Sequence, residues 1–223
     1  GQYTDGHDPK PTPLHTPSKL GSREESLNIN AGYDLGENTR LEWTHLSQDL
    51  THPYLRWGGG ANYNSQKQLV TDGLRASTRL AHGTQLNWTV SESVVKVQDD
   101  YPNLYDTKTR NLGLMWIQNT SWGDLLYNVD RRSDAFDQLQ NGNGDPNFRA
   151  DRSILGQSLG LNLQQGVHAL TLRIRSDRDS LFGVTPTQSM AYAWGGETGF
   201  RASASLATSY RSPTLEQLYS SYG

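Results

Sequence analysis

Hydrophobic and polar side chains alternate along most of the chain. Apolar residues take every second position in a series of runs, and Asn, Ser, Thr, Gly or Arg take the positions between them. The clearest runs are residues 27–35, 86–90, 112–116, 159–163, 170–174 and 200–206. A period of two places the two sets on opposite faces of a β-sheet. The pattern predicts an all-β chain of about ten strands, with one apolar face, one polar face and no long helix.

The connections between the predicted strands fall into two classes. Short turns are expected at residues 36–38, 81–83, 121–124, 164–166 and 195–197, and long polar stretches at 5–22, 49–66, 98–107, 133–151 and 177–187. Short turns at one end of the strands and long loops at the other are typical of an outer-membrane β-barrel. A repeat of about 40 residues also fits a propeller blade, but a blade places four short strands in that length.

Aromatic residues gather near the predicted short turns. Amphipathic rings at one height of a barrel form an interfacial girdle. The candidates for this girdle are Tyr33, Trp43, Trp88, Trp116, Trp122, Tyr127, Tyr192, Trp194 and Phe200.

The composition supports this interpretation only once the strand pattern is known. Hydrophobic residues make up 34% of the chain and the mean hydropathy is −0.73, values that on their own suggest a soluble chain with little core. In a barrel, half of each strand faces a polar lumen, so only the outward half has to be apolar. The net charge of −3 offers no basic field for nucleic acid. The absence of Cys excludes disulfide scaffolds and thiolate metal sites.

Several arginines alternate with apolar positions within the predicted strands. In a packed core each of them would need a partner, whereas in a water-filled or plugged lumen they can stay solvated or pair with a plug. We therefore expect this set to face the lumen; its members are Arg75, Arg79, Arg131, Arg173, Arg175 and Arg201.

Motifs of other functional classes have simpler explanations. Residues 156–160 match the G-x-S-x-G pattern of hydrolases, but Ser158 lies inside an alternating strand with no helix after it, so we expect no enzyme. The oxygen-rich segments 141–145 and 177–179 lack the spacing of a calcium loop. The six His residues show no zinc spacing.

Residues 207–219, Ala-Thr-Ser-Tyr-Arg-Ser-Pro-Thr-Leu-Glu-Gln-Leu-Tyr, carry the most specific motif. This segment resembles the barrel signature of TonB-dependent outer-membrane receptors, and it is most similar to the vitamin B12 (cobalamin) transporter branch. Pro213 cannot donate to a strand ladder, so we expect the strand to end there and the following residues to pack on the barrel rim. The matching positions are Tyr210, Arg211, Pro213, Thr214, Leu215, Leu218 and Tyr219.

The resemblance implies a fold and a function. The fold would be an antiparallel up-and-down transmembrane β-barrel of about 22 strands. Residues 1–223 would form a partial barrel domain with about ten of these strands, and the plug and the C-terminal strands would lie outside it. The protein would be a receptor in the bacterial cell outer membrane, in contact with lipid. It would import a large, scarce nutrient by coupling to TonB through the plug, and the ligand that the resemblance favours is cobalamin.

Two alternatives remain open at this point. Within the same class, the ligand would be a ferric siderophore instead of cobalamin. In a different class, the chain would be a soluble β-rich binding or structural module.

Aromatic side chains in the expected long loops are the candidate contacts for a large ligand. They are Tyr54, Trp57, Tyr101, Tyr105 and Phe182. The resemblance also implies calcium ligands in an early loop, where Asp5 and Asp8 stand, but the dense Asp cluster of the cobalamin branch is missing. We therefore expect no cofactor, with these two residues as the only calcium candidates.

Overall fold

The computed structural model describes the backbone of residues 2–6, 20–55, 62–100, 103–140, 147–195 and 199–219. These residues form one antiparallel sheet in which the strands follow one another in chain order from β1 to β11. The strands are β1 (Gln2–Gly6), β2 (Leu20–Leu35), β3 (Thr39–Leu55), β4 (Asn62–Arg79), β5 (Thr84–Asp99), β6 (Asn103–Thr120), β7 (Gly123–Gln140), β8 (Phe148–Gln165), β9 (His168–Asp179), β10 (Gly183–Gly195) and β11 (Arg201–Ala207). The two helices are short, η1 (Ala81–Gly83) and α1 (Leu215–Tyr219). The predicted all-β, up-and-down architecture is confirmed.

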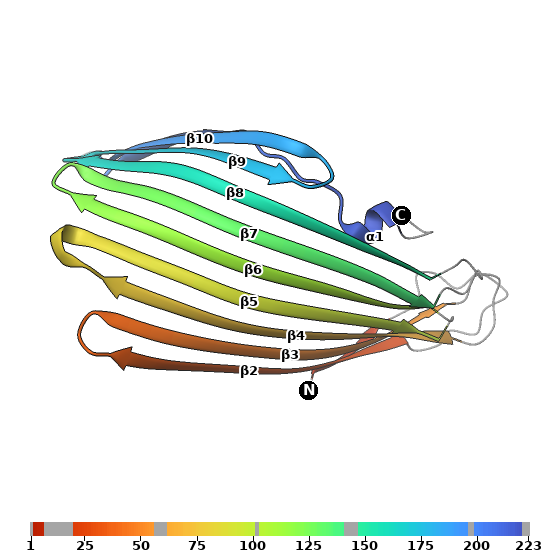
Figure 1. Ribbon diagram of the computed structural model, residues 1–223. Helices are drawn as coiled ribbons and strands as arrows, with labels where there is room; N and C mark the ends of the chain where they lie inside the picture. Colours follow the sequence, from red (N-terminus) through yellow and green to blue (C-terminus); the bar gives the residue numbers. More distant parts are fainter. Residues whose placement is uncertain are drawn as a thin grey trace.

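The strands run side by side in a single curved sheet (Figure 1). Tight hairpins join them at one end, which we call the hairpin end. They lie close to the predicted turns, for example at residues 36–38 and at η1. Gly36 and Gly166 have φ values of +70° and +55° in these turns, a conformation that a side chain at Cβ disfavours.

The strands are longer than the alternation predicts. They extend into the stretches at 49–66, 98–107 and 133–151, because strand pairing uses backbone hydrogen bonds even where both faces carry polar side chains. The expected long loop at 177–187 is wrong. Only residues 180–182 separate β9 from β10.

The cross-strand register divides the sheet into the two expected faces. On the face that we call the apolar face, Trp43 pairs with Leu74, Leu74 with Val90, and Val90 with Leu112. Many large apolar side chains on this face are exposed; they include Leu27, Ile29, Tyr33, Leu114, Tyr127, Leu159, Ile174, Met190 and Leu206. The opposite, polar face carries residues such as Asn28, Asn111, Asp130 and Arg175, so the predicted segregation is confirmed.

One of the predicted lumen-facing arginines lies on the other face. Arg131 aligns with Leu112 on one side and with Leu155 on the other, so it belongs to the apolar face. Its chain neighbours Asp130 and Arg132 occupy the polar face, and two adjacent arginines of one strand cannot share a face.

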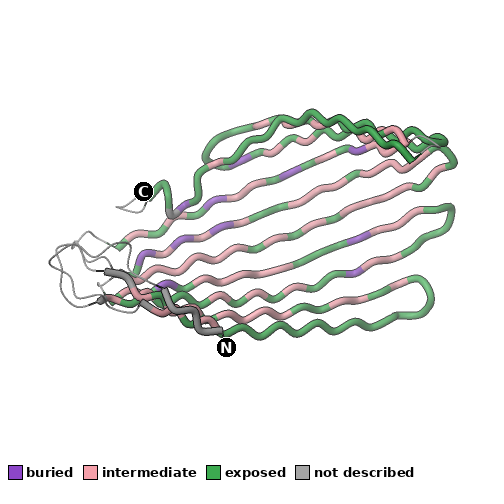
Figure 2. The backbone as a smooth tube through the Cα atoms, turned by 180° about the vertical axis from the view of Figure 1, so that it is seen from behind, coloured by how far each residue is buried: buried purple, intermediate pink, exposed green. Residues whose placement is uncertain are grey.

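Buried residues are scattered along the sheet rather than gathered in one layer (Figure 2). The buried apolar residues are Ala76, Val97, Phe136 and Leu215. The last two belong to the contact between α1 and the strands β7 and β8. Among the described residues, no helix combines the length and the apolar character needed to cross a membrane.

Candidate functional site

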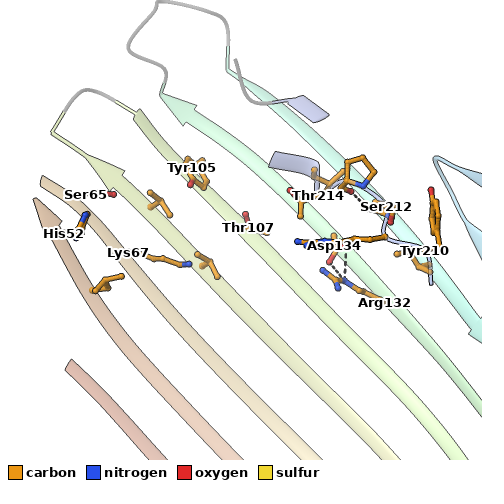
Figure 3. A pocket seen from close by; sticks show the side chains of 18 residues that line it. His52, Ser65, Lys67, Tyr105, Thr107, Arg132, Asp134, Tyr210, Ser212 and Thr214 are labelled. Atoms are coloured by element: carbon orange, nitrogen blue, oxygen red, sulfur yellow. Dashed lines mark hydrogen bonds and ion pairs between the residues drawn. The ribbon is translucent and has the colours of Figure 1, made fainter. Parts of the chain in front are cut away.

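A cavity of about 700 Å³ opens on the polar face, in the half of the sheet away from the hairpin end. Strands β3 to β8 supply its wall, and residues 210–215 close one side (Figure 3). The residues that line it are Leu50, His52, Ser65, Lys67, Val95, Val97, Tyr105, Thr107, Arg132, Asp134, Arg152, Ile154, Tyr210, Arg211, Ser212, Pro213, Thr214 and Leu215.

Residues 208–219, which we call the return segment, leave the sheet after β11 and approach β7 and β8. Thr208 remains hydrogen-bonded to β10. Its N–H donates to the Gln188 carbonyl at 2.9 Å, and its Oγ1 accepts from the Gln188 N–H at 2.9 Å. From there the segment crosses to the middle of the sheet (Figure 1), and its residues 210–215 line the cavity.

The return segment ends in α1, whose start has a capping box. The Gln217 N–H donates to Thr214 Oγ1 at 3.1 Å, and the Thr214 N–H donates to Gln217 Oε1 at 3.0 Å. Leu215, in the first turn, is buried with 3% of its surface exposed. The Tyr219 ring lies 5.9 Å from that of Phe148, so α1 packs on the strands through an apolar contact at each end.

A buried ion pair anchors the return segment to the sheet. Arg152 of β8 pairs with Asp179 of β9 through Nε at 3.0 Å and through Nη2, and both side chains are almost fully buried. The same guanidinium donates from Nη1 to the Pro213 carbonyl at 2.7 Å and from Nη2 to Ser212 Oγ. One arginine therefore joins two strands and the return segment.

Asp179 lies at the end of β9, beyond Ile174, the last apolar side chain that this strand places on the apolar face. Burial works to raise the pKa of the Asp179 carboxyl. Hydrogen bonds from Arg152 and from the N–H groups of Leu181 and Phe182 outweigh burial and hold the pKa below its ordinary value. The carboxylate is thus ionised, as the buried arginine requires.

A second charged network on the polar face explains the first glycine, Gly156, of the G-x-S-x-G pattern. The Arg175 guanidinium crosses β8 to donate to both carboxylate oxygens of Asp130, at 2.7 and 2.8 Å, and it also pairs with Asp177 at 2.7 Å. A Cβ at Gly156 would lie 2.0 Å from the Arg175 Nη2 atom. Gly156 therefore leaves room for this pair.

The cavity wall carries more positive than negative charge. The described lining has four basic side chains and one acidic side chain, Asp134; the basic ones are Lys67, Arg132, Arg152 and Arg211. Arg132 pairs with Asp134 at 2.8 Å and Arg152 with Asp179, whereas no described residue forms an ion pair with Lys67 or Arg211. These two side chains leave the cavity electropositive.

The structure describes the side chains of two of the five predicted ligand contacts, Tyr105 and Phe182, and Tyr105 is the one of these two that lines the cavity. Tyr105 is part of the wall, and its ring lies 5.5 Å from that of Phe136. Tyr54 belongs to β3, opposite Tyr63, but its side chain, like Trp57 and Tyr101, lies outside the described residues. Of the calcium candidates, Asp5 belongs to β1 with a side chain outside the described residues, and Asp8 lies outside them altogether.

Phe182 lies apart from the cavity wall, in the tight turn between β9 and β10. Its ring covers the Arg152 guanidinium, with 5.5 Å between the Arg152 Cζ atom and the ring centroid. The residues of the motif at 207–219 also lie partly in the cavity wall and partly outside it. Leu215 packs on the sheet, Leu218 and Tyr219 stay partly exposed, and the remaining motif positions line the cavity.

Arg152 and Asp179 are among the site residues that sequence reasoning missed, together with Lys67, Arg132 and Asp134 of the cavity wall. Asp179 does belong to the oxygen-rich segment 177–179, whose two carboxylates the structure assigns to Arg175 and Arg152. The one signal for Arg152 in the sequence is that it is an arginine at a polar-face position of a strand. Other arginines have the same signal, so it does not single out Arg152.

Replacing Phe182 by leucine is expected to lower the free energy of unfolding by about 0.5–1 kcal/mol, because it removes a cation–π contact at a partly exposed site. Urea titration of the complete protein in detergent, followed by tryptophan fluorescence, measures the change. Leu181→Ala, at the adjacent exposed side chain of the same turn, is the control. Equal effects of the two substitutions would contradict a specific role of the ring.

No family model matches the sequence. The siderophore receptor PirA from Pseudomonas aeruginosa has a similar structure, with a TM-score of 0.72 and 11% identity over 87% of this chain and 35% of that one. The RagAB peptide transporter gives a TM-score of 0.60 and 8% identity, over 79% of this chain and 30% of that one. The chain spans about a third of the length of these proteins. The sheet thus has the fold of a part of these receptor and transporter structures.

Proposed function

We propose that the chain forms part of the wall of a β-barrel receptor in the bacterial outer membrane. The observation that carries this proposal is the apolar face, on which large side chains such as Tyr33, Leu112, Leu159 and Ile174 are 49–68% exposed. No described residue covers this face, and a continuous exposed surface of large apolar side chains is unusual on a soluble monomer. A lipid bilayer is the environment in which such a face is stable.

The polar face would form the lumen of this barrel. Its charged networks, Arg175 with Asp130 and Arg152 with Asp179, lie on the side that a barrel keeps away from lipid. The role that we infer is active import of a large nutrient. A plug domain in the lumen and TonB would be the partners, as the resemblance of residues 207–219 implies. Such a receptor binds and transports its ligand without covalent chemistry, so we propose no enzymatic activity.

Two ligand classes are supported by different observations. Cobalamin follows from the resemblance of residues 207–219 to the cobalamin branch. A ferric siderophore is supported by the similarity to PirA, a siderophore receptor, and an anionic ligand of this class would be attracted to the electropositive cavity around Lys67 and Arg211.

Uptake by the complete gene in a strain that lacks its own cobalamin and siderophore receptors tests the proposal. Rescue of growth by either ligand, lost when TonB is deleted, is the expected result. Rescue on cobalamin alone would select the first ligand, and rescue on ferric siderophores alone the second. A gene product that remains in solution without detergent would overturn the membrane assignment and favour a soluble β-rich module.

A further inference from the structure

Two arginines interrupt the apolar face at one level of the sheet. The register aligns Arg131 and Arg178 in one row, on either side of Leu155. Leu112 and Val184 flank them at the two ends of this row. Arginine thus alternates with apolar side chains across β6 to β10, at the margin of the apolar face away from the hairpin end.

Neither arginine is neutralised within the described chain. Both side chains are exposed, and no described residue forms an ion pair with either. The acidic side chains nearby already have partners, since Glu92 pairs with Lys108 at 2.8 Å and with Arg110 at 2.6 Å. The unpaired charge at this margin therefore belongs to Arg131 and Arg178.

The surface next to Arg131 is hollowed. A shallow groove of about 490 Å³ reaches it from β3, with Trp43, Leu74, Val90 and Leu112 along its apolar side. Arg131 closes the groove at β7. Asp72, Glu92 and Arg110 also line the groove, but Asp72 is paired with His45, and Glu92 with Lys108 and Arg110. A groove with an apolar side that ends at an unpaired cation fits an amphiphile with an acyl chain and an anionic head.

We propose that Arg131 and Arg178 bind a phosphate group of an outer-leaflet lipid whose acyl chains lie on the apolar face. This proposal rests on the proposed membrane location. Neighbouring strands lie about 4.8 Å apart, so the Cα atoms of the two arginines are about 10 Å apart across Leu155. Two long side chains at that separation can converge on one phosphate, and guanidinium groups match its oxygens in bidentate geometry.

Their position on the sheet supports a lipid rather than a free anion. Arginine at the edge of an apolar surface keeps its stem on that surface and extends its charged head toward the polar layer. The head groups of membrane lipids lie in that layer. A lipid joined to the apolar face by its chains would present its phosphate at the height of both arginines.

The test compares lipid retention by the complete receptor in nanodiscs that contain diphosphoryl lipid A, measured by native mass spectrometry. The double variant Arg131→Gln/Arg178→Gln is expected to retain the lipid roughly 30-fold more weakly than the wild type. The matched control is Arg75→Gln/Arg173→Gln, which removes the same charge from the polar face, where no described residue forms an ion pair with either arginine. It should retain the lipid as the wild type does.

Two further arms separate the sources of phosphate. Fully dephosphorylated lipid A should bind the wild type as weakly as the phosphorylated lipid binds the double variant, and inorganic phosphate should not displace the lipid. Equal retention by the double variant and the wild type, or ready displacement by inorganic phosphate, would overturn the lipid site. A receptor that does not insert into the bilayer would overturn the proposed function as well.

Discussion

Replacement of Arg152 by methionine is expected to lower the free energy of unfolding of the complete receptor by about 3–5 kcal/mol. The substitution keeps an unbranched side chain but removes the charge that neutralises Asp179, whose side chain is only 6% exposed. It also removes the donors to the Ser212 hydroxyl and the Pro213 carbonyl, so the return segment loses its polar anchor. The larger part of the effect comes from the buried carboxylate that is left without a partner.

Urea titration in detergent micelles measures the loss, and two variants show its origin. Arg149→Met removes two ion pairs, with Asp137 at 3.6 Å and with Asp151 at 3.5 Å, from an arginine that is 66% exposed, so it should change the free energy by less than about 1 kcal/mol. The double variant Arg152→Met/Asp179→Leu removes both buried charges and should recover much of the loss. If Arg152→Met lowered the free energy of unfolding no more than Arg149→Met does, the buried ion pair would not contribute to the stability of the receptor.

The two faces of the sheet can be predicted from the sequence wherever apolar residues take every second position of a strand. Leu112, Leu114 and Trp116 must share a face once residues 112–116 form a strand. The same rule fails at the strand ends, where both faces carry polar side chains. The run from Thr51 to Leu55 therefore looked like a loop, although it pairs with β4 residue by residue.

The anchor of the return segment could not be predicted in this way. Arg152 meets Asp179 only because the β8–β9 register places Ile154 opposite Asp179, and it meets Ser212 only because the chain returns across the sheet 60 residues later. Neither contact produces a recognisable pattern in the local sequence. The prediction that Arg131 faces the lumen is wrong for a different reason. At the margin of the apolar face an arginine can keep its stem on that face and extend its head into polar surroundings.

Substitution of Leu206 by arginine is expected to destabilise the inserted receptor by about 2–4 kcal/mol, the cost of a basic side chain near the bilayer midplane on the lipid face of a barrel. Leu206 aligns with Met190, and Met190 with Leu172, so it belongs to an apolar row. The Leu206 side chain is 72% exposed, so no described residue of the chain covers it.

The neighbouring substitution Ser205→Arg separates the lipid face from the strand. Ser205 aligns with Ala191 on the polar face, so an arginine there would extend into the lumen and should cost less than about 1 kcal/mol. Both variants add the same side chain to β11 at adjacent positions, so propensity and edge effects nearly cancel between them. Unfolding titrations in lipid vesicles give the two values. Equal losses would contradict the assignment of the apolar face to lipid, whereas a large loss at Leu206 alone requires that this face meet hydrocarbon.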